Sequence, residues 1–303
     1  MTFMPSFLHR YLGKLRDSLA SAIYNKMYYS IRAYHLTYIT LHSQEKGVIE
    51  GLKEAPELIV SLSTHGRRLY EVYLAIESIM QGSMKPNRIV LWLSKDLQDE
   101  QLPLTLLNQI KRGLVVKYTD DIGPYTKLVP ALTDYPNSIL VTIDDDILYP
   151  YDTLELLYSA YQKYPRCICA NRIMDVTLDK QGHPTSLPTW KELGNKDRIS
   201  KLNFFEGVGG VLYPPHCFDS EVHNQSVFAA ICPTADDVWF NCMALLSKTA
   251  VIPADYHYSR FPLLINESVQ DSALWRINNS NKITPNDKQL RAVMKKYNLS
   301  YAE

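Results

Sequence analysis

The sequence predicts an α/β protein with a mainly parallel sheet flanked by helices. Residues 58–62, 88–93 and 138–143 form short runs that are apolar on both faces, and helix-length amphipathic segments separate such runs. Strands and helices that alternate in this way are typical of a parallel sheet covered on both sides. With 303 residues, 46% of them apolar, the chain can bury the core of one large domain with appendages, or of two small domains.

The elements follow one another from residue 56 onward. The predicted strands are 58–62, 88–93, 114–118, 138–143 and 166–170, and the predicted helices are 69–80, 100–111, 126–132 and 153–164. Residues 171–205 then lack regularity, which in a compact domain indicates a functional loop or lid. A basic helix is expected over 285–297.

The N-terminal stretch has a helical pattern of its own. Apolar residues recur at every fourth position from Phe7 to Ile31, and this spacing winds around a helix of 3.6 residues per turn. We therefore expect two helices, or a bent one. They would pack on the body or on a second subunit of a homodimer; alternatively, the basic, tyrosine-rich residues 1–46 would attach to an anionic membrane surface.

The charge balance excludes a uniformly basic protein. The 32 cations equal the 32 acids, so we expect no nucleic-acid partner. The net charge of zero results from two opposite parts of the chain: residues 1–46 carry six cations and two acids, and the remaining residues carry an excess of four acids. We predict a basic helical extension at 1–55, an α/β domain at 56–265 and a helical tail at 266–303.

Targeting signals and cysteines indicate the compartment. The sequence has no run of about 18 apolar residues that could span a membrane, and its N-terminus does not resemble a signal peptide. The five cysteines form no C-x-x-C pair, which indicates buried, reduced thiols. We expect a cytoplasmic protein, with peripheral contact at the inner face of the cell membrane if the N-terminal stretch binds lipid.

Three consecutive carboxylates follow one of the buried strands. Asp144, Asp145 and Asp146 come directly after Leu140–Ile143. Alternation along a strand would point Asp144 and Asp146 to one side and Asp145 away or toward a neighbouring loop. The carboxyl ends of parallel strands are where such sheets bind ligands, and Mg²⁺ or Mn²⁺ would relieve the repulsion between the acids. The alternative is a solvated acidic turn.

A second acidic pair, Asp236 and Asp237, opens a predicted helix after Thr234. Thr234 is expected to cap this helix, and acids in a first turn suit the positive end of the helix dipole. A carboxylate held there could also serve as a general base that takes a proton from a hydroxyl.

Other segments add polar groups to the same picture. Residues 61–68 supply hydroxyls, Gly66 and two arginines after the first strand, where a nucleotide would enter. Residues 123–127 offer the ring of Tyr125 for stacking on a ligand and the ammonium of Lys127 for contact with a phosphate. The glycines of 206–210 suit close approach of the backbone to a substrate rather than a dinucleotide loop, because Pro214 and Pro215 prevent the required helix. His257 is a structural histidine or a third metal ligand.

Together these segments resemble the glycosyltransferases of the GT-A fold, in particular inverting family 2 and its bacterial capsule or lipopolysaccharide relatives. The resemblance covers roughly residues 56–260. Its carrying residues are Val60-Ser61-Leu62-Ser63-Thr64, Asp144-Asp145-Asp146, Gly209-Gly210 and Ala235-Asp236-Asp237. It implies a Rossmann-like catalytic domain with helical extensions at both ends.

The resemblance also implies roles for individual residues. The donor, a nucleoside-diphosphate sugar, would bind at Ser63, Thr64, Arg67, Lys127, Asp144 and Asp145. Mn²⁺ or Mg²⁺ would be held by Asp144 and Asp146; His257, which the resemblance does not assign, is either their third ligand or a structural histidine. Asp237 maps onto the catalytic base, and Asp236 lies beside the acceptor.

The sequence departs from the family pattern in two ways. Lys127 replaces the frequent Ala-Arg-Asn stretch, and the Gln-x-x-Arg-Trp element of processive synthases is missing. We therefore expect transfer of one sugar to a glycan or lipid-linked acceptor in surface polysaccharide synthesis. The alternatives are a sugar nucleotidyltransferase, or a non-catalytic module that binds carbohydrate or metal.

Overall fold

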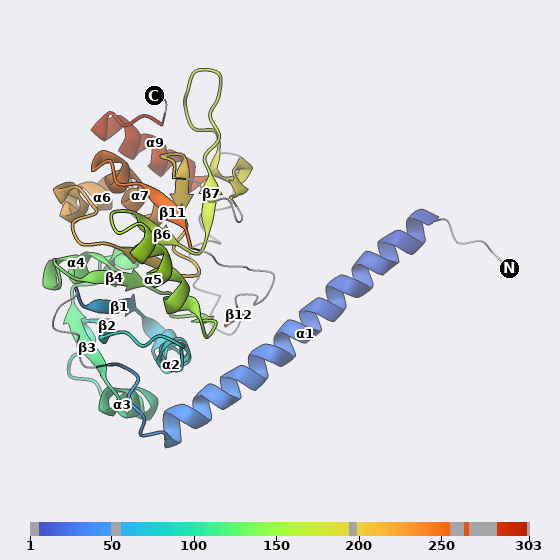
Figure 1. The fold of residues 1–303 in the computed structure, drawn as a ribbon, viewed down its shortest axis with the longest axis vertical. Coiled ribbons are helices and arrows are strands. Elements are labelled where there is room, and N and C mark those ends of the chain that lie inside the picture. The colour runs from blue at the N-terminus through green and yellow to red at the C-terminus, as the bar shows by residue number, and fades with distance from the viewer. Residues whose placement is uncertain (1–5, 50–55, 194–198, 255–263, 267–283, 302–303) are drawn as a thin grey trace.

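A twisted seven-stranded sheet forms the centre of the molecule (Figure 1). The computed structural model describes residues 6–49, 56–193, 199–254, 264–266 and 284–301. The strand order is β11-β6-β10-β4-β1-β2-β3, and only β10 runs against its neighbours in this sheet. The strands are β1 Leu58–Ser63, β2 Arg88–Ser94, β3 Leu114–Thr119, β4 Ile139–Thr142, β6 Ile168–Ala170, β10 Val211–Tyr213 and β11 Val251–Pro253. The predicted α/β fold class is confirmed.

Helices cover both faces of this sheet and create two cores. The helices are α2 Tyr73–Met80, α3 Leu104–Lys111, α4 Val129–Asp134, α5 Thr153–Lys163, α6 Gln225–Ile231, α7 Asp236–Leu246 and α9 Pro285–Tyr297. Neighbouring residues of a strand point to opposite faces. Ile59 therefore packs in the core formed with α4, α6, α7 and α9, whereas Val60 packs in the core formed with α2, α3 and α5.

Several predicted helices are shorter than expected because short 3₁₀ turns precede them. The predicted helix 69–80 is divided into a 3₁₀ turn, η1 Gly66–Tyr70, and helix α2. The predicted helix 126–132 is likewise preceded by η3 Gly123–Lys127, in which Gly123 has a φ of 66°. Because glycine adopts positive φ without steric cost, the chain turns here and α4 begins only at Val129.

The segment expected to be irregular, 171–205, contains a small antiparallel sheet. Its strand order is β8-β7-β9, with β7 Ile173–Asp175, β8 Lys191–Glu192 and β9 Asn203–Phe205. Strands of two or three residues are too short to give a periodic pattern. A further pair, β5 Ile147–Leu148 with β12 Leu264–Ile265, follows the acidic turn.

The C-terminal helix α9 lies where the sequence predicted it. Thr284 and Asp287 cap it reciprocally. Asp287 also accepts hydrogen bonds from the hydroxyl of Ser186 and the backbone N–H of Leu187, at 2.6 and 2.8 Å. The helix therefore fastens the segment around the small sheet to the body.

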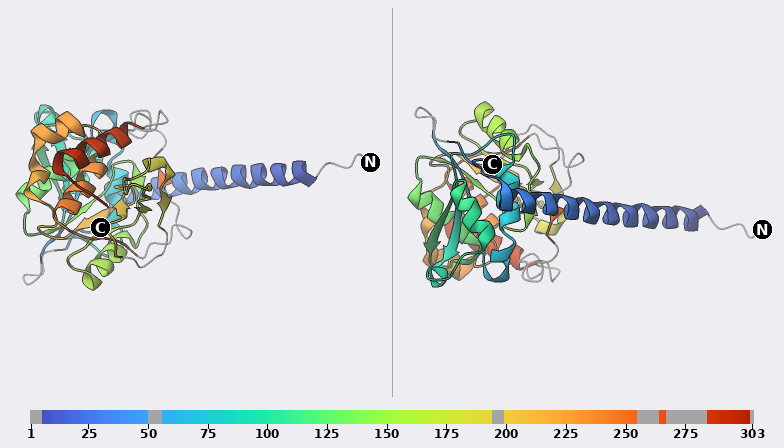
Figure 2. Two further views of the ribbon diagram at one scale, coloured as in Figure 1. Left: turned by 90° about the horizontal axis from the view of Figure 1, so that it is seen from above. Right: turned by 90° about the horizontal axis from the view of Figure 1, so that it is seen from below.

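The N-terminal helix α1 is one helix from Ser6 to His42, so the expectation of two helices or a bent one is wrong. Figures 1 and 2 show its N-terminal part running away from the body. Among the side chains of α1 that the structure describes, those that pack on the body lie in the C-terminal part, with Leu36 fully buried and Thr37 bonded to Tyr73 of α2 at 2.9 Å. A winding apolar stripe does not have to bend a helix that buries only part of its length.

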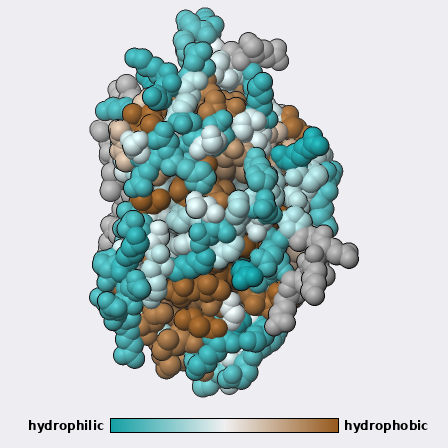
Figure 3. Space-filling model, turned by 90° about the vertical axis from the view of Figure 1, so that its left-hand side faces the viewer, coloured by the Kyte–Doolittle hydropathy of each residue, from teal (hydrophilic) through white to brown (hydrophobic). Residues whose placement is uncertain are grey.

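Apolar side chains are also exposed on α3. Leu104, Leu107 and Ile110 lie on this helix with their side chains partly in solvent. Figure 3 shows hydrophobic side chains gathered at the lower end of the face that Figure 1 assigns to α3 and β3. This α3 patch is on the opposite side of the molecule from the free end of α1.

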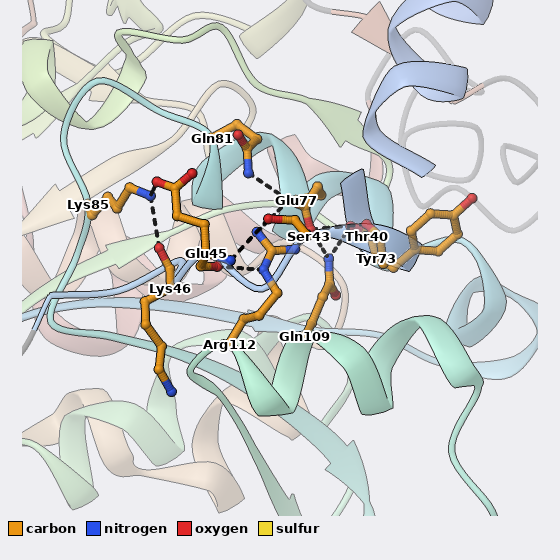
Figure 4. A network of polar contacts seen from close by, with 10 residues as sticks. All are labelled: Thr40, Ser43, Glu45, Lys46, Tyr73, Glu77, Gln81, Lys85, Gln109 and Arg112. Atoms are coloured by element: carbon orange, nitrogen blue, oxygen red, sulfur yellow. Dashed lines mark hydrogen bonds and ion pairs between the residues drawn. The ribbon is translucent and has the colours of Figure 1, made fainter. Parts of the chain in front are cut away.

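A buried ion pair anchors α1 to the body (Figure 4). Arg112 donates two hydrogen bonds to the carboxylate of Glu77, at 2.8 and 2.9 Å, and both side chains are buried. Thr40 of α1 donates to the same carboxylate at 3.0 Å, and Gln81 and Gln109 complete the set. Elements α1, α2 and α3 therefore share one polar junction.

The thiols agree with their prediction. All five cysteines are unpaired, and four of them are buried, whereas Cys167 is partly exposed. Among the residues that the structure describes, no helix has both the length and the apolar character that crossing a membrane requires.

Candidate active site

The acidic turn after β4 lies at the carboxyl edge of the sheet, next to the loop after β1. Asp145 is buried there and accepts a hydrogen bond from the hydroxyl of Thr64 at 2.6 Å. It also accepts one from the guanidinium of Arg68 at 2.7 Å. Asp145 thus turns toward a neighbouring loop, as predicted, and holds the two loops together.

Asp144 and Asp146 have different cationic partners. Asp144 Oδ1 lies 3.1 Å from Lys127 Nζ, whereas Asp146 Oδ2 lies 3.4 Å from the guanidinium of Arg68. The backbone N–H of Asp144 donates to the hydroxyl of Tyr149, which is fully buried. The acidic cluster is therefore paired with cations rather than being a solvated turn.

Lys127 joins the two acidic segments that the sequence singled out. Its Nζ lies 3.1 Å from Asp144 Oδ1 and 3.2 Å from Asp236 Oδ2. Asp144 and Asp236 are 92 positions apart in the chain, yet one ammonium lies between them. The backbone carbonyl of Lys127 also accepts a hydrogen bond from Ser61 of β1 at 2.6 Å, which fixes η3 against the sheet.

Asp237 lies one residue further along α7 and is held by backbone groups. Its Oδ2 accepts the N–H of Gly207 at 3.0 Å. A Cβ at Gly207 would lie 2.9 Å from Asp237 Oδ1 and 3.2 Å from Lys127 Nζ, so glycine is what allows this close approach. Asn241, one turn further along the same face of α7, donates to the carbonyls of Asp237 and Phe205 at 2.7 and 2.8 Å.

The environment shifts the pKa values of this cluster. Burial, and then the charge of Asp236, raises the pKa of Asp237 to about 8, although Lys127 acts in the opposite direction. Burial raises the pKa of Asp236 as well. Burial lowers the pKa of Lys127, but the charges of Asp144, Asp236 and Asp237 outweigh it and hold that pKa well above its usual value. A cation and an acid that titrates near neutrality therefore lie side by side.

The loop after β1 places its two arginines differently. Ser63 is partly exposed at the end of β1, and Arg67 is exposed. Arg68, which was not predicted, is the buried arginine that contacts Asp145 and Asp146. The sequence shows two adjacent arginines but not which one the 3₁₀ turn η1 directs inward.

Two smaller expectations at this edge of the sheet are wrong. Tyr125 is fully buried and stacks on Phe228, with 4.0 Å between ring centroids, so its ring is not free to stack on a ligand. The residue that caps α7 is Ala235, because Thr234 is occupied by both groups of the Gln289 amide, at 2.9 and 3.0 Å. His257 lies outside the described residues.

Helix α1 contacts the segment that follows the acidic turn. Arg32 donates a hydrogen bond to the carbonyl of Tyr149 at 3.2 Å, and the hydroxyl of Tyr149 supports Asp144. Burial, and then the charges of neighbouring groups that include Glu71 and Asp146, raise the pKa of Tyr29. The inner face of α1 therefore borders the candidate site, which the sequence did not indicate.

A cavity of about 420 Å³ lies apart from the carboxylates, between β2, β3 and α4. Its lining includes Trp92, Lys117 and Asp134. The charged groups there satisfy each other, since Lys117 Nζ lies 2.5 Å from Asp134 Oδ2 and 5.6 Å from the centre of the Trp92 ring. The residues that carry acid, base and cation chemistry are in the carboxylate cluster instead.

The donor atoms of the acidic turn suit a hard divalent cation. Within the described residues, no group of three or more His, Cys, Asp or Glu is arranged as a metal site. Asp144 and Asp146 offer two carboxylates, both partly accessible to solvent. Mg²⁺ and Mn²⁺ in nucleotide enzymes are often bound by one or two carboxylates, with substrate phosphates as further ligands, so the residues present fit such an ion.

Similar folds exist among solved structures. No protein family matches the sequence, and no curated protein matches it. The crystal structure of S. aureus TarS 1–349 has a TM-score of 0.44 and 12% identity over 66% of this chain and 58% of that chain. An inositol-1-phosphate CTP transferase from T. maritima has a TM-score of 0.39 and 13% identity over 68% and 86%. A UDP-glucose pyrophosphorylase gives 0.39 and 10% over 67% and 91%.

The chain thus spans less than two thirds of the TarS chain. At these identities the likeness concerns the fold alone. What the site does is therefore argued below from its residues.

Proposed function

We propose that the protein is a glycosyltransferase that moves one sugar from a nucleoside-diphosphate sugar to a hydroxyl group of a glycan or lipid-linked acceptor. The observation that carries the proposal is the position of Lys127 between Asp144 and Asp236. One acidic segment suits a metal-bound diphosphate, the other suits proton removal, and the ammonium lies where negative charge would develop between them.

Asp237 is the general base of this proposal. A base works best when its pKa is near the operating pH, and the pKa of about 8 at Asp237 meets that condition. Its carboxylate accepts the N–H of Gly207, and its backbone carbonyl accepts the amide of Asn241. It would take the proton of the acceptor hydroxyl as that oxygen bonds to the anomeric carbon and the bond to the nucleoside diphosphate breaks.

Lys127 would stabilise the departing diphosphate. Its pKa lies well above the usual value because three carboxylates surround it, so it remains charged throughout the working range of the enzyme. Arg68 has a positioning role, because it already bonds Asp145 and fixes the loop after β1. Arg67 is the exposed arginine of that loop and is assigned to the donor site as a proposal.

Asp144 and Asp146 would hold Mg²⁺ or Mn²⁺, which supplies charge neutralisation for the diphosphate. We assign Ser63 and Thr64 to the donor as well, since Ser63 ends β1 and Thr64, the next residue, bonds to Asp145 of this turn. In activity assays with a nucleotide-sugar and an acceptor, excess EDTA is expected to abolish transfer and added Mn²⁺ to restore it. Full activity in EDTA would remove the metal from the proposal.

The substitution Asp237→Asn tests the base. The amide keeps the size of the side chain and an oxygen that can accept from Gly207, but it cannot take a proton. We expect kcat to fall by about 10²–10⁴ while the Kd of the nucleotide-sugar, measured by calorimetry, stays within about twofold. The matched control is Asp134→Asn, a partly exposed carboxylate outside the cluster. Unchanged turnover in Asp237→Asn would contradict the assignment.

The products distinguish the alternatives. Release of a nucleoside diphosphate that depends on the acceptor supports sugar transfer. Formation of a nucleoside triphosphate from the nucleotide-sugar and pyrophosphate would instead identify a sugar nucleotidyltransferase, and binding of the donor without any turnover would identify a non-catalytic module.

A further inference from the structure

Helix α1 has a second, unpartnered face. Large apolar side chains along it are exposed, among them Ile31 at 66% and Tyr34 at 76%. Their spacing alternates between three and four residues, which places them on one side of a helix. This outer seam consists of Tyr24, Met27, Ile31, Tyr34, Tyr38 and Leu41.

The outer seam lies opposite the face that packs on the body. At about 100° per residue, Tyr34 and Tyr38 point roughly half a turn away from Leu36, which is buried against the body. Arg32 and Thr40, which bond to Tyr149 and Glu77, belong to the inner face. The anchoring of α1 therefore leaves the seam uncovered by any described residue of this chain.

The surroundings of the seam are open. In Figure 1 the body lies on one side of α1, beside its C-terminal part, and the two views of Figure 2 show the rest of the helix extending clear of the sheet and its covering helices. A flat surface could contact the outer seam along several turns without meeting the body.

The charge of α1 indicates which kind of partner would cover the outer seam. Residues 6–42 contain five cations, Arg10, Lys14, Arg16, Lys26 and Arg32, and one acid, Asp17. Two copies paired along this seam would bring two strongly basic helices together with almost no acids to offset the repulsion. An anionic lipid surface offers the complementary charge, and tyrosine is a residue type that favours the boundary between lipid and water.

We propose that the outer seam of α1 docks on the surface of an anionic lipid bilayer. The helix would lie in the plane of the interface, with the seam in the headgroup region and the body on the aqueous side. Its inner face contacts Tyr149, whose hydroxyl supports Asp144, and a helix with side chains is about 10–12 Å thick. The candidate site would therefore lie about one helix diameter from the bilayer. As a consequence that rests on the proposed function, a lipid-linked acceptor is favoured over a free glycan.

Vesicle sedimentation of the full chain tests the docking surface. The vesicles contain either phosphatidylcholine alone or phosphatidylcholine with 30 mol% phosphatidylglycerol, at an ionic strength of about 0.1 M. We expect the wild type to bind the anionic vesicles at least tenfold more tightly than the neutral ones. Ile31→Gln combined with Tyr34→Ser is expected to weaken anionic binding at least tenfold.

The matched control removes similar side chains elsewhere. Leu104→Gln combined with Tyr151→Ser changes one aliphatic residue and one tyrosine that are 62% and 65% exposed, and binding should stay within twofold of the wild type. If the α1 double variant does not fold, judged by circular dichroism, Met27→Gln combined with Tyr38→Ser replaces it.

Three results would overturn the proposal. One is equal binding to neutral and anionic vesicles, and another is an equal loss in the control and the α1 variants. The third is a wild type that is dimeric in sedimentation velocity, becomes monomeric in the α1 variant and binds no vesicles, since the seam would then be a contact between two copies. Because vesicle binding is measured without turnover, these outcomes stand whether or not sugar transfer is found.

Discussion

Lys127 is the cation that the two acidic segments of the candidate site share. Its ammonium lies within 3.2 Å of two carboxylates, and its side chain is 15% exposed. In Lys127→Met these carboxylates would face each other without a cation. We expect the free energy of unfolding at pH 7 to fall by about 2 kcal/mol, less than for a fully buried pair because water reaches the cluster.

Urea denaturation at pH 7 and pH 5 measures this effect. The loss should be smaller at pH 5, because protonation of the acids removes the repulsion. Lys95→Met is the control, since Lys95 and its partner Asp120 are both largely exposed, and should change stability by no more than about 0.5 kcal/mol. An equal loss at both pH values would show that packing, not charge, sets the cost.

Asp237 should also leave a signature in the pH dependence of stability. Its folded-state pKa of about 8 lies above the value of an unfolded aspartate, so the folded protein retains a proton that the unfolded chain releases. The free energy of unfolding should therefore fall as the pH rises from about 4 to about 8. In Asp237→Asn this contribution is absent, and the decline measured by urea denaturation at pH 5, 7 and 9 should be shallower. Identical declines in the two proteins would place the pKa of Asp237 near its ordinary value.

At the scale of elements, the junction of α1, α2 and α3 decides whether α1 stays in place. Arg112→Met would leave the carboxylate of Glu77 buried without its guanidinium. Removing one partner of such a pair costs about 3–5 kcal/mol. We expect the free energy of unfolding to fall by that amount, and we expect limited proteolysis to cleave within α1 faster than in the wild type. The control Arg88→Met breaks a largely exposed pair with Glu57 and should cost less than about 1 kcal/mol.

The elements also show which patterns carry information. Five strands of the central sheet were predictable because they lie in runs of apolar residues, and α9 was predictable because Pro285-Asn286-Asp287 suits the start of a helix. The strands β10 and β11, of three residues each, were missed. The strands β7 to β9 were missed because two or three residues give no periodicity. The straightness of α1 was missed because the sequence shows an apolar stripe but not how much of it is covered.

At the scale of the whole molecule, the site combines residues that the sequence marks with residues that it does not. Asp144 and Asp237 are visible as acids after a strand and at a helix start, and the parallel sheet predicts where the first of them lies. Arg68 and Gly207 become significant only when distant segments meet, since one contacts Asp145 and the other contacts Asp237. Long-range proximity of this kind leaves no local pattern in the chain.

The whole molecule also provides a test of the donor site that needs no acceptor. A ligand that binds only the folded state stabilises it by RT ln(1 + [L]/Kd), or about 2.7 kcal/mol at 100 times Kd. For a chain of 303 residues that corresponds to a rise in Tm of roughly 4 °C. We expect one member of a panel of nucleoside diphosphates to give this rise with Mn²⁺, and neither component to give it alone.

Asp144→Asn combined with Asp146→Asn should abolish the shift relative to its own ligand-free Tm, because the two carboxylates of the acidic turn would be lost. A panel in which no nucleotide raises the Tm of the wild type would mean that the acidic turn does not bind a donor, and that its carboxylates serve only to hold Lys127 and Arg68 in place.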